Sequence, residues 1–148
     1  MAKLSGHTEP DERHQRPAGC SDATVAAVGK LSEAWETVER ARGHLYAFHQ
    51  LMGGADLTLG DAVAQLGDAG HADVAADLQH ELVGRNVLAG RWTFQVVEEF
   101  DDTYWSVFRA HEQAVRDALL AGRRHIYEAE MKEARRSDGQ PGHDATPQ

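Results

Sequence analysis

The stretch that decides the fold is Arg91–Ala121, with the sequence RWTFQVVEEFDDTYWSVFRAHEQAVRDALLA. It holds two of the three Trp of the chain, and its apolar residues recur every three or four positions, which is the spacing of a helix face. Two adjacent stripes result: one of Val97, Phe100, Tyr104, Val107, His111, Ala114 and Ala118, and one of Phe94, Asp101, Trp105, Phe108, Val115 and Leu119. Together they are wider than a one-sided apolar face. We therefore expect one long helix that contacts neighbours on two sides, one of them a second subunit.

Another long helix is predicted earlier in the chain, from Asp22 to Met52. Its apolar stripe also follows helical spacing and comprises Val28, Leu31, Trp35, Val38, Leu45, Phe48 and Met52. Ser21 or Asp22 can cap the first turn by accepting a hydrogen bond from a backbone N–H. The pair Gly53-Gly54 predicts the end of this helix, because glycine favours helix termination.

Between the two long helices the pattern predicts a short helical hairpin. Thr58 can cap its first helix, with Asp61 three residues later as in a capping box. Its second helix starts at about Ala72 and ends near Gly84. The apolar residues of the two short helices are Leu59, Val63 and Leu66, then Val74, Leu78 and Leu82. The expected fold class is all-α, a helical bundle of two long antiparallel helices plus this hairpin.

The two ends of the chain are polar. Their polar composition predicts that residues 1–21 form a disordered N-terminal arm and that residues 137–148 form a disordered tail. Neither segment can bury enough apolar surface to fold. Residues 22–136 are expected to form one helical domain. Its last segment, beyond Gly122, has few apolar residues and predicts an extra C-terminal helical arm.

Charge and cysteine content exclude several classes of protein. The net charge of −9 argues against nucleic-acid binding and against attraction to anionic membranes. No run of 18 apolar residues exists that could span a bilayer. The single cysteine, Cys20, fits a reducing cytoplasm. Between Gly43 and Gly84 there is no Lys or Arg, but there are six acids: Asp56, Asp61, Asp68, Asp73, Asp77 and Glu81.

The loop between the hairpin and Thr93 carries four candidate ligand-binding residues: Arg85, Asn86, Arg91 and Trp92. Glycines allow the backbone to turn at positive φ there. The guanidinium groups can bind a carboxylate or phosphate through two parallel hydrogen bonds. The alternative is that both arginines pair with acidic neighbours and only hold the loop in place.

Six further residues offer atoms that could bind a metal: His49, Asp77, His80, Glu98, Asp102 and His111. Di-iron helical bundles require two E-x-x-H pairs and additional Glu on the facing helices, and this chain has no E-x-x-H. The acids between Glu98 and Asp102 are explained by a solvated face near a helix N-terminus, where negative charge is favoured. We therefore predict no metal and no cofactor.

The sequence contains no recognisable catalytic motif. No serine lies in a G-x-S-x-G elbow, and Cys20 has no nearby His to activate it. His125 and Glu128 share a helix face and are expected to pair with each other. Two long helices and one hairpin bury little apolar surface by themselves. The favoured function is thus a structural or interaction module that forms a homodimer; the alternative is a bundle that binds a small molecule or a metal, with or without catalysis, through residues 85–102.

Overall fold

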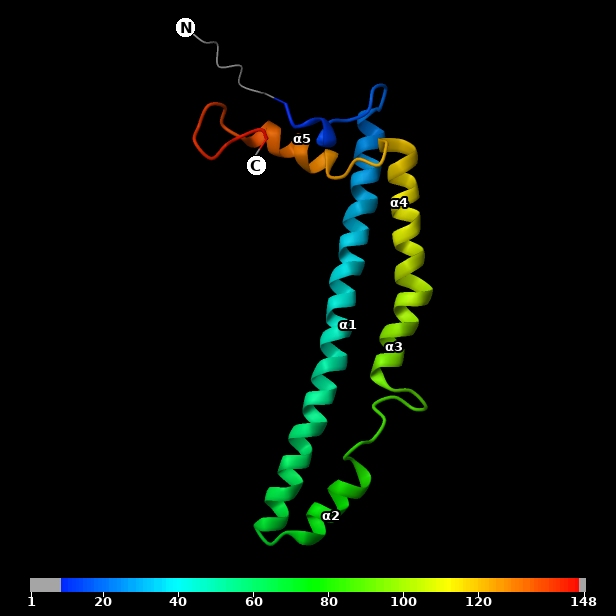
Figure 1. Cartoon of the computed structure of the whole chain (residues 1–148), viewed down its shortest axis with the longest axis vertical. Helices are drawn as coiled ribbons and strands as arrows, with labels where there is room; N and C mark the ends of the chain where they lie inside the picture. The colour runs from blue at the N-terminus through cyan, green and yellow to red at the C-terminus, as the bar shows by residue number, and fades with distance from the viewer. Residues whose placement is uncertain (1–8, 147–148) are drawn as a thin grey trace. The chain divides into compact units, whose positions relative to one another are not determined.

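The computed structural model describes residues 9–146, and all regular secondary structure in this range is helical, which confirms the all-α class. The first element in this range is a short 3-10 turn, η1, and a π-helical segment, η2, joins α3 to α4. Figure 1 labels the helices α1 to α5. None of the helices in this range is both long enough and apolar enough to cross a membrane. The elements in order are η1 (Glu12–His14), α1 (Asp22–Asp68), α2 (Ala72–Glu81), α3 (Thr93–Phe100), η2 (Asp101–Trp105), α4 (Ser106–Leu120) and α5 (Ile126–Arg135).

The contacts of the chain divide it into two compact units. Among the described residues, unit 1 comprises 9–37 and 107–146, and unit 2 comprises Val38–Ser106. Helix α1 contributes residues to both units, so each unit is built around a different part of the same helix.

Helix α1 begins as predicted but continues past the predicted end. The backbone N–H of Thr24 donates to Ser21 Oγ at 3.1 Å, which confirms the Ser21 cap. The prediction that Gly53-Gly54 ends the helix is wrong, because α1 runs through both glycines. Thr58 does not cap a new helix: its hydroxyl donates to the carbonyl of Gly54 within α1. The expected first helix of the hairpin is therefore the last part of α1.

The true end of α1 is a glycine cap. Gly70 has a φ of +91°, a left-handed conformation that glycine adopts without steric cost. The N–H of His71 donates to Leu66 O at 2.9 Å, and the N–H of Gly70 donates to Gly67 O at 3.0 Å. This pair of bonds is the Schellman arrangement, which satisfies the last carbonyls of a helix. Helix α2 then begins at Ala72, as predicted.

The predicted long helix over residues 93–121 is interrupted. The N–H of Ser106 donates to Asp101 O, five residues back, which places one π-helical turn between α3 and α4. The extra residue shifts the helix faces after Phe100. Next to the π-turn, Trp105 and Phe108 of one predicted stripe are partly buried, whereas Tyr104 and Val107 of the other are each 52% exposed.

Unit 1 has an apolar core. Ile126, at the start of α5, is 1% exposed and packs in one buried cluster with Val25, Val28 and Leu120. Next to Ile126, Tyr127 of α5 lies close to the α1 backbone. A Cβ added at Gly29 would lie 3.1 Å from Tyr127 Cβ. The predicted C-terminal helix exists, and its first turn is anchored within the chain.

Part of the predicted N-terminal arm also contacts α5. Residues 1–8 lie outside the described range. Arg16 Nε and Nη2 donate to the two carboxylate oxygens of Glu130 at 2.7 and 2.8 Å. Arg123 donates to the carbonyl of Gln15 at 2.8 Å. Hydrogen bonds therefore hold residues 15 and 16 on α5 and the loop before it.

Unit 2 has fewer buried apolar residues than unit 1. Ala75, 8% exposed, and Val97, 5% exposed, are its two buried apolar residues. The elements run antiparallel, because Arg42 of α1 pairs with Asp101 while His49, two turns later, bonds to Thr93. Large apolar side chains that remain at least 38% exposed are Tyr46, Phe48, Leu51, Leu57, Val74, Leu82, Val87, Leu88, Trp92, Phe94 and Tyr104.

Candidate functional site

The most distinctive concave feature of unit 2 is a cavity of about 360 Å³ beside the loop that follows α2. Apolar side chains from α1, the loop and α3 form much of its wall. Polar groups from α1 and the loop complete the rim. The residues that line it are Met52, Gly53, Asp56, Gly84, Arg85, Asn86, Val87, Trp92, Thr93 and Phe94.

Hydrogen bonds attach this loop to α1 at both ends. The N–H of Gly84 donates to Asp56 Oδ1 at 2.8 Å. At the other end, His49 Nδ1 and Thr93 Oγ1 lie 2.7 Å apart. Gly84 adopts a φ of +72°, which lets the backbone reverse immediately after α2. The loop is thus held against α1 rather than depending only on apolar packing.

Three of the four predicted ligand-binding residues line this cavity: Arg85, Asn86 and Trp92. The rings of Trp92 and Phe94 lie with centroids 5.2 Å apart, a common separation for interacting aromatics. Trp92 is 56% exposed, so a bound apolar group could still cover a large part of it. The cavity can accept an apolar or aromatic group, with Arg85 available for a carboxylate.

Arg91, the fourth predicted residue, lies elsewhere. It forms an ion pair with Glu99, and both residues line a separate cavity of about 490 Å³. The nearby acids Glu98 and Asp102 also line that cavity and are exposed. The contact between Arg91 and Glu99 agrees with the interpretation in which an arginine holds the loop in place.

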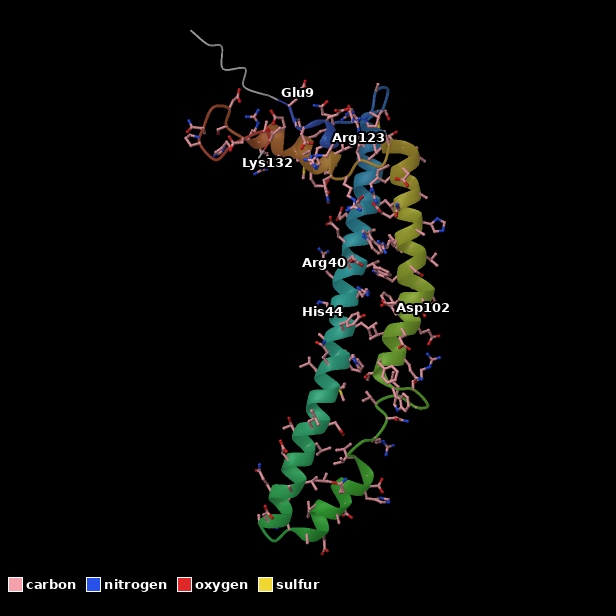
Figure 2. All side chains as sticks on the ribbon, in the orientation of Figure 1. Glu9, Arg40, His44, Asp102, Arg123 and Lys132 are labelled. Carbon is pink, nitrogen blue, oxygen red and sulfur yellow. The ribbon has the colours of Figure 1, made fainter. Side chains whose placement is uncertain are left out.

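The acidic segment is divided by the π-turn. Arg42 Nε and Nη2 donate to the two carboxylate oxygens of Asp101 at 2.7 and 2.9 Å. These hydrogen bonds, and secondarily the positive charge of Arg42, hold the pKa of Asp101 below its ordinary value. The Arg42 guanidinium also lies 4.5 Å from the ring centroid of Trp105, whose Nε1 donates to Glu39. Asp101 is therefore a structural partner of α1, whereas Asp102 lies on the outer side (Figure 2).

The six predicted metal-ligand residues do not form a ligand set within either unit of the described chain. His49 bonds to Thr93, and His80 Nδ1 lies 2.9 Å from the carboxylate of its neighbour Glu81. His111 belongs to unit 1 and is exposed there. Three other residues do come together. Within residues 9–146, one ligand atom each of Glu36, His125 and Glu128 lies within 4.8 Å of the other two.

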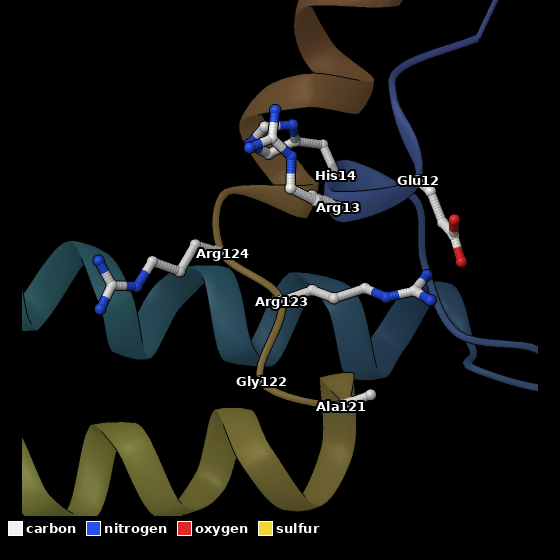
Figure 3. Close-up of a pocket in the computed structure, with 7 residues that line it drawn as sticks. All are labelled: Glu12, Arg13, His14, Ala121, Gly122, Arg123 and Arg124. Carbon is white, nitrogen blue, oxygen red and sulfur yellow. The ribbon is translucent and has the colours of Figure 1, made fainter.

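Unit 1 contains a cavity of about 480 Å³ between η1 and the turn after α4. Its lining includes Arg13, His14, Arg123 and Arg124, a concentration of basic side chains. Figure 3 shows that Arg123 and Arg124 point in opposite directions and that Arg13 and His14 point away from both. These cations do not converge on one point, so the cavity does not resemble an anion site.

Sequence reasoning missed a buried charge in unit 1. Glu112 is 7% exposed, and its carboxylate accepts hydrogen bonds from Arg116 and from Ser32, each at 3.2 Å. The i,i+4 spacing of Glu112 and Arg116 was available as a signal. The spacing could not show that this pair faces α1, because the π-turn changes which face of α4 is inward.

Comparison with known proteins finds no matching family model, no similar curated protein and no similar solved structure. The function must therefore be argued from the residues of this chain. Two arrangements stand out: the partly apolar cavity with its exposed surroundings in unit 2, and the Glu36, His125 and Glu128 group in unit 1.

Proposed function

We propose that the protein is a structural and interaction module that binds a second copy of itself through unit 2. The observation that supports this most strongly is the imbalance between two buried apolar residues in unit 2 and eleven large apolar side chains that remain exposed. Exposed apolar groups that form a patch are typical of interaction sites. Removing them from water gains about 25 cal/mol per Å². A dimer would then supply the four-helix-like core that the sequence favours, in the cytoplasmic setting expected from a single cysteine.

The surface best suited to this contact surrounds the unit 2 cavity. We call it the loop surface and define it as Met52, Val87, Trp92 and Phe94, all of which line the cavity. Aromatic residues such as Trp are enriched at the centres of protein interfaces. A two-fold interface brings the same patch of both copies together. Because Arg85 and Asp56 lie on the same rim, such pairing can place the arginine of one copy near the aspartate of the other.

The net charge of unit 2 predicts how self-association should depend on salt concentration. Unit 2 has eleven acidic and four basic residues, a net charge of −7. Two copies therefore repel each other at long range, and salt screens this repulsion. We expect added NaCl to strengthen the self-association. A cationic protein partner would show the opposite dependence.

The test is the molar mass in solution of the wild-type protein and two variants, by light scattering after size exclusion. Wild type should be dimeric at tens of micromolar, and Trp92→Glu should be monomeric with unchanged helical circular dichroism. Leu57→Glu is the matched control, because Leu57 is 76% exposed but lies about 140° around α1 from Met52. A monomeric wild type at 100 µM and high salt, or equal loss of dimer in both variants, would disprove the proposal.

A second candidate function uses the same cavity. Arg85, Asn86 and Trp92 all line it, which favours a small aromatic carboxylate as ligand. Benzoate should then quench the fluorescence of wild type with saturation, and Arg85→Ala should abolish saturation. A linear, non-saturating response in wild type would remove this candidate without affecting the dimer proposal.

A further inference from the structure

The start of α5 brings two metal-ligand side chains together with a third from α1. Glu36 comes from α1, His125 is the residue immediately before α5, and Glu128 lies in the first turn of α5. One ligand atom from each lies within 4.8 Å of the other two. All three belong to unit 1, so the group is defined within one compact unit.

The backbone that carries these side chains is fixed from both sides. Ile126, between His125 and Glu128, is 1% exposed in the unit 1 core. Tyr127 packs directly on the backbone of α1 at Gly29. Gly29 and Glu36 are seven residues apart, two turns of helix, and so lie on one face of α1. The two glutamates and the histidine are thus presented by helices whose contact is tightly packed.

The predicted pairing of His125 with Glu128 accounts for only part of the group. His125 Nδ1 lies 3.8 Å from Glu128 Oε1, an ion pair when the histidine is protonated but too long for a hydrogen bond. The two carboxylates bring like charges within a few ångströms of each other, and this costs free energy unless a cation is present. A divalent ion would be neutralised by the two carboxylates and would draw all three side chains inward.

We propose that Glu36, His125 and Glu128 bind one Zn²⁺ ion. Zn²⁺ takes histidine nitrogen and glutamate oxygen ligands at about 2.0–2.2 Å, usually in a tetrahedron. Three ligand atoms within 4.8 Å can reach these distances through small rotations of exposed side chains. Mg²⁺ and Ca²⁺ fit less well, because both prefer oxygen ligands only. The fourth position is left for water, and the ion links α5 to α1.

The experiment uses the full-length, tag-free protein after treatment with a chelator, titrated with ZnCl₂ by calorimetry. Wild type should bind one equivalent, its Tm should rise by a few degrees in excess Zn²⁺, and amide hydrogen exchange in α5 should slow. Glu36→Gln, Glu128→Gln and His125→Asn should each weaken binding at least tenfold. Asn is chosen because His125 has a φ of +57°, a conformation that Asn tolerates.

Matched controls separate this site from general attraction of cations to an acidic protein. Glu33→Gln removes a carboxylate one turn from Glu36, and His111→Asn removes an exposed histidine of the same unit. Both should bind Zn²⁺ like wild type. The ligand side chains are outside the core, so unchanged circular dichroism is expected for every variant. The proposal is overturned if wild type binds no Zn²⁺, if Mg²⁺ binds as tightly, or if the controls weaken binding as much as the ligand variants.

Discussion

Units 1 and 2 are built on the same helix, α1, but are stabilised in different ways. Unit 1 packs α5 and the end of α4 into an apolar cluster around Ile126 and encloses the charged pair of Glu112 and Arg116. Unit 2 has hydrogen bonds and ion pairs at its helix contacts and leaves eleven large apolar side chains exposed. A small apolar core contributes little stability. This contrast is the reason that we propose self-association through unit 2.

The largest effect is expected from the core of unit 1. Ile126→Ala removes methyl and methylene groups from a site that is 1% exposed, and such a change costs about 2–5 kcal/mol. Leu57→Ala, in unit 2, alters a side chain that is 76% exposed and should change stability by less than about 0.5 kcal/mol. Urea denaturation followed by circular dichroism measures both. Equal losses would mean that the contrast between the two units does not govern stability.

Glycines inside α1 should respond in opposite directions in the two units. Gly29→Ala in unit 1 places a Cβ 3.1 Å from Tyr127 Cβ, and overpacking of this kind costs about 1–3 kcal/mol. Gly53→Ala in unit 2 meets nothing within 4 Å, so alanine should stabilise the helix by about 0.5–1 kcal/mol. Thermal denaturation of the two variants gives the sign of each change. A loss of stability in Gly53→Ala would show that a partner packs closely on that face of α1.

The end of α1 shows where sequence reasoning succeeds and where it fails. The Ser21 cap was predictable because it depends on neighbouring residues only. The continuation through Gly53-Gly54 was also visible in the sequence, since Leu45, Met52, Leu59 and Leu66 follow at intervals of seven and are all partly buried. Glycine ends a helix where the chain adopts a positive φ, as at Gly70, and Gly53 and Gly54 lie within α1.

The π-turn and the proposed zinc ligands could not be predicted from the local sequence pattern, because both involve contacts between residues that are distant in sequence. The extra residue in η2 accompanies the contact of Asp101 with Arg42, which joins distant parts of the sequence. Glu36 is likewise far from His125 in sequence, and the packing of Ile126 and Tyr127 on α1 brings them together. In the loop of unit 2, by contrast, unusual residues are adjacent in sequence, so Arg85, Asn86 and Trp92 could be proposed before the cavity was known.

The ion pair of unit 2 predicts a dependence of stability on pH. Hydrogen bonds from Arg42 lower the pKa of Asp101 below its ordinary value of 3.8. The carboxylate therefore contributes its full stabilisation above the pKa of the unfolded chain, near 4, and loses it as the pH falls through the lower pKa of the folded state. Arg42→Ala should lower stability at pH 7 by about 1–2 kcal/mol and by less at pH 2–3. Urea denaturation at both pH values measures the difference. An equal loss at both would mean that the aromatic contacts of Arg42, and not the ion pair, stabilise unit 2.

The smallest expected effect concerns backbone strain, which distinguishes the two units again. The non-glycine residues with positive φ in the described chain, Ala121 and His125, both belong to unit 1. Ala121→Gly should stabilise the protein by up to about 1 kcal/mol, because a left-handed conformation is strained for alanine and not for glycine. The reverse change in unit 2, Gly84→Ala at a φ of +72°, should destabilise it by a similar amount. If Ala121→Gly has no effect, the turn after α4 is not strained by its contacts. If it stabilises the protein as expected, the core around Ile126 holds Ala121 in a left-handed conformation that alanine does not favour. Such a rigid core is the support that a metal site at the start of α5 requires.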